Sequence, residues 1–222
     1  PTKPGLKIPQ MFEAAINKEL KGVWIIGEDI VQTDPNSAHV IEAMNSLELL
    51  VVQEIFMSET AKLATVVLPG TTFLEKDGTF TNTERRVQRV NRAAKPLPGT
   101  KPDGVIVTEM MQKLGYDQKT YDADEVLAEI ADIVPFFKGI TRERLGKLGL
   151  QWPVKEDGTD TKILHEKEFK LGKGRLKYFD WKESTEIREN KKEYPLILTT
   201  SRVLQHYNAA TMTRRTNNID LC

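Results

Sequence analysis

The chain has 222 residues, and its 32 Lys and Arg residues balance 32 Asp and Glu residues, so the formal net charge is zero. A neutral chain gives no electrostatic reason to bind nucleic acid or an anionic membrane, and we expect neither as a partner. The one cysteine, Cys222, excludes a disulfide within the chain and a cysteine-ligated iron–sulfur cluster. No apolar run is long enough to span a bilayer, so we expect no membrane insertion.

The first 70 residues alternate between helical and strand patterns. Apolar residues at helical spacing over 8–20 predict a helix, and β-branched apolar runs at 23–26 and 49–53 predict buried strands. Ser58 is a typical N-cap for a short helix, which leads to a third strand at 65–68. This β-α-β-α-β order predicts an α/β fold, with a Rossmann-like parallel sheet, flanking helices and right-handed crossovers.

The turn after the first predicted strand carries acidic residues. Gly27 ends the strand, and the carboxylates of Glu28 and Asp29 follow it. Asp34 and Pro35 then predict a helix start, with Asp34 as N-cap and Pro35 at the first helical position. Such carboxylates can accept hydrogen bonds from ribose hydroxyls or a guanine edge, while helix N–H groups face phosphate. The alternative is an ordinary turn with solvated acids.

The second predicted strand also ends in polar residues, Gln53 and Glu54. In a parallel sheet the carboxyl ends of neighbouring strands meet at one edge, so these side chains should lie near Glu28 and Asp29. The convergence predicts a nucleotide site at this edge.

A basic cluster follows the Asp77-Gly78 turn signal. It consists of Arg85, Arg86, Arg89 and Arg92. Guanidinium groups suit phosphates or a contact with another subunit. The alternative is the charged, solvated edge of a hairpin.

Two amphipathic helices are predicted next, over 103–114 and after Asp122. The composition changes near Gln151, and we expect one domain over 1–152 and a second over 153–222. The second domain shows strand patterns at 175–181 and 194–200, followed by an irregular, ligand-facing loop. Nothing after this loop completes a β domain, so we expect a piece cut from a longer polypeptide.

Four segments, in this order, resemble the molybdopterin oxidoreductase family, and most closely its formate dehydrogenase catalytic alpha subunits. They are G-E-D-I-V-Q-T-D-P-N, V-V-Q-E-I-F-M-S-E-T-A-K-L-A-T-V-V-L-P, D-G-T-F-T-N-T-E-R-R-V-Q-R and L-T-T-S-R-V-L-Q-H-Y-N-A-A-T-M-T-R-R. The similarity covers nearly the whole chain. One departure is Thr65, where many relatives carry aspartate.

The resemblance implies that 1–152 binds the guanine dinucleotide end of a molybdopterin cofactor, and that 153–222 begins a C-terminal β-barrel domain that also binds it. The positions that match the family's cofactor-binding segments are Gly27, Glu28, Asp29, Thr33, Asp34, Gln53, Glu54, Ile55, Arg202, His206 and Thr211. Arg202 and His206 would contact pterin and phosphate groups. A packed loop histidine is the alternative for His206.

The resemblance also implies a parent enzyme that oxidises formate to carbon dioxide. Its cofactor would be molybdopterin guanine dinucleotide holding molybdenum or tungsten, with a 4Fe-4S cluster in the parent but outside this chain. The family's catalytic and metal-ligating residues lie upstream of the matched segments, so we expect none here. Partners would be the rest of the same catalytic subunit and electron-transfer subunits. We expect a cytoplasmic location, with the periplasm left open.

Two other hypotheses remain. A related oxidoreductase subunit, such as a nitrate reductase or the NADH dehydrogenase large subunit, would be distinguished by the metal-ligating residue upstream. A stand-alone guanine-nucleotide-binding or interaction module would have a complete fold and bind GMP or GDP reversibly.

Overall fold

The computed structural model describes residues 4–215 of the chain. The chain divides into two units, 1–162 and 163–222, and each is described by itself. Within the part that is described, no helix is both long enough and apolar enough to cross a membrane.

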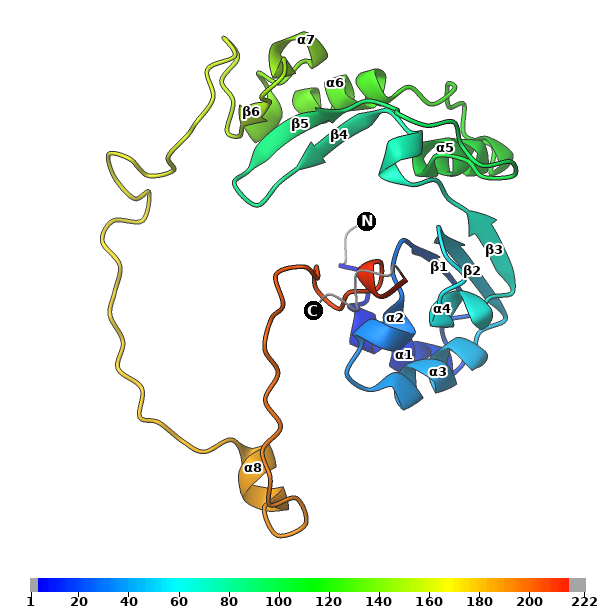
Figure 1. The fold of residues 1–222 in the computed structure, drawn as a ribbon, viewed down its shortest axis with the longest axis vertical. Coiled ribbons are helices and arrows are strands. Elements are labelled where there is room, and N and C mark those ends of the chain that lie inside the picture. The colour runs from blue at the N-terminus through cyan, green and yellow to red at the C-terminus, as the bar shows by residue number, and fades with distance from the viewer. Residues whose placement is uncertain (1–3, 216–222) are drawn as a thin grey trace. The chain divides into compact units, whose positions relative to one another are not determined.

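The first unit opens with a parallel sheet (Figure 1). Its three strands are β1 (Gly22–Ile26), β2 (Leu49–Glu54) and β3 (Val66–Pro69), in the spatial order β1-β2-β3. Ile26 of β1 pairs with Gln53 of β2, so both strands end at the same edge. The predicted parallel sheet is therefore confirmed.

Short helices pack against this sheet. They are α1 (Ile8–Ile16), α2 (Ile30–Thr33), α3 (Ser37–Asn45) and α4 (Glu59–Lys62). Figure 1 shows α1 and α3 lying together below the strands. Because apolar residues recur at helical spacing, one face of α1 and α3 meets the buried strand residues. The core residues are Phe12, Ala15, Ile25, Val31, Val40, Ala43, Met44, Leu50, Val52 and Ala61.

The rest of the first unit contains an antiparallel sheet and several helices. It is formed by β4 (Gly78–Thr81), β5 (Arg86–Val90) and β6 (Leu150–Gln151), in the order β4-β5-β6. The helices are α5 (Asp103–Lys113), α6 (Ala123–Ile133) and α7 (Arg142–Leu145), with 3₁₀ turns at Phe73–Glu75 and Pro135–Phe137. A second, smaller core holds Val87, Leu127, Ile140, Leu145 and Val154.

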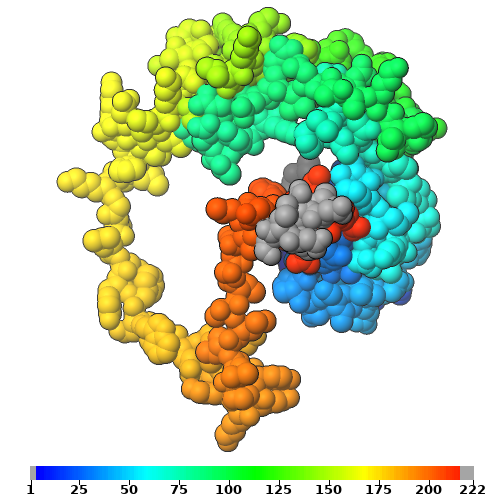
Figure 2. All heavy atoms as spheres, viewed as in Figure 1, coloured from blue at the N-terminus to red at the C-terminus, as the bar shows by residue number. Residues whose placement is uncertain are grey.

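The second unit has little regular structure over its described residues, 163–215. It contains α8 (Thr185–Asn190) and a 3₁₀ turn at Thr213–Arg215. In Figure 2 the yellow and orange segment is a thin run of atoms without a packed interior.

The strands predicted at 175–181 and 194–200 are not formed in this chain, and the prediction of strands there is wrong for the described residues. The apolar side chains that suggested these strands are exposed, Leu176 at 104% and Leu198 at 90%. A strand requires a neighbour to pair its N–H and C=O groups, and alternation of side chains alone does not supply one. The β-barrel assignment stays a prediction.

Candidate functional site

The carboxyl edge of the parallel sheet brings two predicted turns side by side. The backbone N–H of Gly27 donates to the carbonyl of Gln53 at 2.9 Å, which joins the end of β1 to the end of β2. Gly27 has φ +64°, a conformation that favours glycine, and a Cβ built there would meet nothing within 4 Å. The backbone at Gly27 is therefore open to the close approach of another molecule.

Asp29 lies beneath this edge, with 3% of its surface exposed. Its Oδ1 accepts hydrogen bonds from the backbone N–H of Thr60 at 3.0 Å and the Thr60 hydroxyl at 2.8 Å. The same hydroxyl accepts from the backbone N–H of Val31 at 3.1 Å. Asp29 therefore ties the turn after β1 to the first turns of α2 and α4, which fixes the shape of the edge.

Glu28 and Thr33 form the exposed rim of the same turn. The Thr33 hydroxyl donates to Glu28 Oε1 at 2.6 Å, so the two predicted site residues are brought together. Both side chains reach solvent, where a ligand hydroxyl could replace one partner of this bond.

Asp34 is the C-cap of α2 and not the N-cap of the helix that follows, so that part of the prediction is wrong. Its Oδ1 accepts from the backbone N–H of Asn36 at 2.9 Å, and α3 begins only after Asn36. The Asn36 side chain accepts from the backbone N–H of His39 at 3.3 Å and is the actual N-cap. Asp side chains often bond two residues ahead in this way, which moves the helix start beyond Pro35.

Gln53 and Glu54 continue the edge at the end of β2. Glu54 Oε1 accepts from the backbone N–H of Ile55 at 2.7 Å, so this carboxylate folds back onto its own turn. Gln53 is 1% exposed, and its Nε2 donates to Asp103 Oδ1 at 2.8 Å. The predicted residue Gln53 therefore has a partner that the sequence reasoning did not identify.

Asp103 is the first residue of α5 and pairs through Oδ2 with the Lys76 ammonium. Burial raises the pKa of Asp103, but the hydrogen bonds from Lys76 and Gln53 outweigh it and leave the pKa below its ordinary value. Gly70 permits this arrangement, because a Cβ there would lie 3.1 Å from Asp103 Oδ1. The carboxylate is thus ionised at neutral pH.

Two buried polar atoms in the residues at the strand ends have no hydrogen-bond partner within the described chain: Gln53 Oε1 and Thr71 Oγ1. Leaving a buried polar atom unpaired costs about 1–3 kcal/mol. Both atoms can accept a hydrogen bond, and the N–H and O–H groups of a guanine base and ribose could supply one. A ligand that reached these two atoms would therefore have to present hydrogen-bond donors to them.

The three predicted site residues of the second unit lie in its last described segment. His206 Nδ1 lies 2.6 Å from the Thr213 hydroxyl, and the carbonyl of Thr211 accepts from Arg215 Nε at 3.2 Å. Arg202 is exposed. His206 is half-buried.

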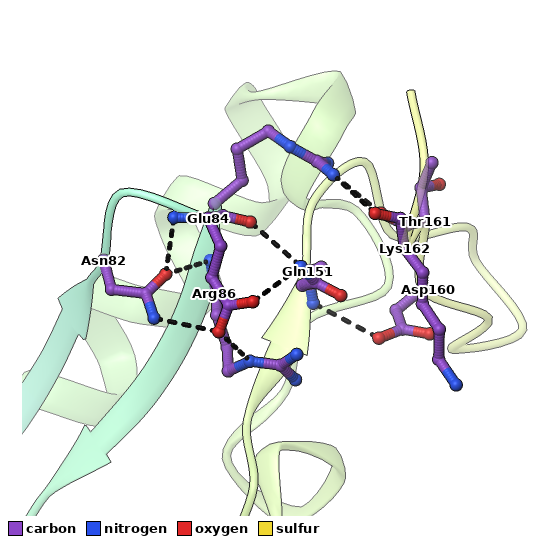
Figure 3. A network of polar contacts seen from close by, with 8 residues as sticks. Asn82, Glu84, Arg86, Gln151, Asp160, Thr161 and Lys162 are labelled. Carbon is purple, nitrogen blue, oxygen red and sulfur yellow. Dashed lines mark hydrogen bonds and ion pairs between the residues drawn. The ribbon is translucent and has the colours of Figure 1, made fainter. Parts of the chain in front are cut away.

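Two members of the basic cluster have structural roles. Arg85 donates to the carbonyls of Trp152, of Thr161 at 3.0 Å and of Lys162 at 3.1 Å. Figure 3 shows the adjoining network, in which Arg86 donates to Glu84 at 2.8 Å. The contacts of Arg85 hold the 150–162 segment against the hairpin.

The same network joins the hairpin to β6. Gln151 Nε2 donates to the Glu84 carbonyl at 3.1 Å (Figure 3). Arg89 donates to Asn91 at 3.0 Å, within its own strand end. Arg85 and Arg86 therefore have structural contacts and are partly buried, and β5 lies between β4 and β6, so the alternative of a solvated hairpin edge does not describe these two residues. Over 4–215 no group of three or more His, Cys, Asp or Glu side chains is arranged to hold a metal ion.

The fold is an open α/β sheet, and in such sheets ligands bind at the carboxyl edge of the strands. Comparison with known proteins identifies the family. The molybdopterin oxidoreductase family model matches residues 1–113, and the chain belongs to this family.

Two curated relatives are similar over 97% of the chain. One is the F420-dependent formate dehydrogenase subunit alpha of Methanocaldococcus jannaschii, 44% identical over 32% of that protein. The other is the F420-dependent formate dehydrogenase 2 subunit alpha of Methanococcus maripaludis, 44% identical over 33% of its length. The chain thus spans about a third of these relatives. Among solved structures, acetylene hydratase from Pelobacter acetylenicus matches 60% of this chain and 19% of its own, with TM-score 0.47 and 18% identity.

Proposed function

We propose that this chain is the nucleotide-binding part of a formate dehydrogenase catalytic subunit. The whole enzyme would oxidise formate to carbon dioxide, and residues 1–152 would hold the guanine nucleotide end of a molybdopterin guanine dinucleotide. The observation that carries the proposal is the carboxyl edge, where the open backbone at Gly27 donates to the carbonyl of Gln53, whose side-chain oxygen is buried and has no partner among the described residues. The names and 44% identity of the two curated relatives support the choice of substrate.

The residues at this edge suit one end of the cofactor. Glu28, Thr33 and the Gln53 oxygen are acceptors for ribose hydroxyls or guanine N–H groups. Bound molybdopterin would supply the molybdenum or tungsten that accepts electrons from formate. This chain's own groups would bind and orient the nucleotide, and Arg202, His206 and Thr211 would contact pterin or phosphate from the second domain. The remaining catalytic residues and the 4Fe-4S cluster would belong to the rest of the subunit, with electron-transfer subunits as partners.

Guanine nucleotide binding by the 222-residue chain tests the proposal. We expect GDP to bind in isothermal titration calorimetry and Gly27→Asn to weaken it by about tenfold or more, because the new side chain occupies the approach to the backbone. Asparagine tolerates a positive φ, so the turn should persist. Gly115→Asn is the matched control, since Gly115 has φ +88° and open space around its Cβ, at the end of α5.

Equal weakening in both variants, or no GDP binding by the wild type, would contradict the proposal. Formate supplies a second test. The chain alone should not reduce a dye with formate as the electron donor, and such activity would contradict the assignment of catalysis to the rest of the subunit.

A further inference from the structure

Three side chains from separate segments form one line of polar contacts in the first unit. Lys76 comes from the turn before β4, Asp103 begins α5, and Gln53 ends β2. The Lys76 ammonium pairs with Asp103 Oδ2, and Asp103 Oδ1 accepts from Gln53 Nε2 at 2.8 Å. The line ends at Gln53 Oε1, which is buried and has no partner among the described residues.

The charge of Asp103 decides which way the Gln53 amide points. An ionised carboxylate only accepts hydrogen bonds, so it selects the NH₂ side of the amide and leaves Oε1 on the other side. A protonated carboxyl group can donate, and it would equally well face Oε1. The amide could then turn over and present NH₂ where the oxygen had been.

Lys76 is what keeps Asp103 in its ionised form. Asp103 is about half-buried, and burial alone disfavours the charged carboxylate. The ammonium supplies both an opposite charge and a hydrogen bond. Lys76 and Asp103 line a small cavity, and the other titratable groups that line it are Asp77 and Tyr121, neither of which can supply a positive charge.

We propose that Lys76 is a positioning residue for the nucleotide edge: it holds Asp103 so that Asp103 fixes the Gln53 amide with its oxygen free to accept from the nucleotide. The inference rests on the proposed function, because it assumes that the edge binds a guanine nucleotide. The inference gives a role to Lys76, which would not contact the nucleotide and is not among the cofactor-binding positions that the resemblance implies.

The test measures the affinity for GDP between about pH 5 and pH 8 for five versions of the chain, the wild type and four variants. The wild type should keep its affinity over this range. Lys76→Met, which retains most of the stem, should bind nearly as well at pH 8 and about tenfold more weakly at pH 5, as Asp103 takes up a proton. Lys76→Arg should restore the wild-type profile.

Two further variants separate positioning from structure. Asp103→Asn, whose amide can face either side of Gln53, should bind weakly at every pH. Lys138→Met is the matched control, because Lys138 pairs with Glu156 on the exposed surface. It should leave the pH profile unchanged.

The outcomes distinguish this inference from the proposed function. If the wild type binds no GDP, the proposed function fails and this inference with it. If the wild type binds and Lys76→Met has the same affinity at every pH, the inference alone is overturned. If Lys76→Met is weakened equally at every pH, Lys76 has only a structural role, which also overturns it.

Discussion

The Thr60 hydroxyl is the smallest group on which the shape of the nucleotide edge depends. Thr60 is fully buried, and its hydroxyl donates to Asp29 Oδ1 at 2.8 Å while accepting from the Val31 N–H at 3.1 Å. Replacing Thr60 with valine keeps the shape of the side chain but removes both bonds. We therefore expect Thr60→Val to destabilise the first unit strongly.

The size of the effect follows from these two contacts. A hydrogen bond to a charged group contributes about 1.5–3 kcal/mol, and a buried N–H left unpaired costs about 1–3 kcal/mol. Thr60→Val should therefore lower the free energy of unfolding by about 3–5 kcal/mol. Thr60→Ser keeps the hydroxyl and loses one methyl group, which costs about 1 kcal/mol.

Urea unfolding followed by far-ultraviolet circular dichroism would measure both variants. The serine variant controls for the loss of packing, and GDP titration would show whether the edge keeps its shape. If Thr60→Val and Thr60→Ser lowered the free energy of unfolding by the same amount, within about 0.5 kcal/mol, the Asp29–Thr60 hydrogen bond would not be what fixes the shape of the edge.

Two further predictions concern the second part of the first unit. Arg85→Met should raise the rate of hydrogen exchange in peptides covering 150–162, because three backbone carbonyls lose a charged donor. Arg89→Met is the control and should leave that rate unchanged. Equal exchange rates in the two variants would contradict the role of Arg85. The pKa of Glu75 is lowered, chiefly by hydrogen bonds from the backbone and side chain of Thr72. Its stabilising contribution should therefore be fully present above the ordinary pKa of glutamate and be lost as the pH falls below it. The difference in free energy of unfolding between wild type and Glu75→Gln, measured in urea, should shrink as the pH is lowered, and a constant difference would refute this.

The sequence predicted the parallel sheet because that part of the fold depends on short-range patterns. The runs at 23–26 and 49–53 are apolar and β-branched, and β1 and β2 form there. The meeting of Gly27 and Gln53 at one edge followed from the parallel order alone.

Other features depend on contacts between distant residues, and no local pattern contains them. Asp103 contacts Gln53 across 50 positions, and the only local signal was an acidic residue at a helix start. The two-residue strand β6 is too short to show alternation and exists because it pairs with β5. Asp34 was assigned as a cap from residue type alone, although Asn, Asp and Ser compete for that role within three positions.

Binding roles at the edge remain predictions for the same reason, since the ligand's own groups decide which acceptors are used. Asp29 illustrates this point: its position favoured direct contact with a nucleotide, whereas its Oδ1 is bonded to Thr60. Glu28 and Thr33 are the more accessible members of the predicted set.

Hydrogen–deuterium exchange of the 222-residue chain with GDP and with ADP tests the central claim most directly. We expect GDP to protect peptides covering 27–34, 53–56 and 70–76, with weaker protection by ADP at the same concentration. Protection elsewhere, or none with either nucleotide, would contradict the assignment of this edge as the guanine nucleotide site.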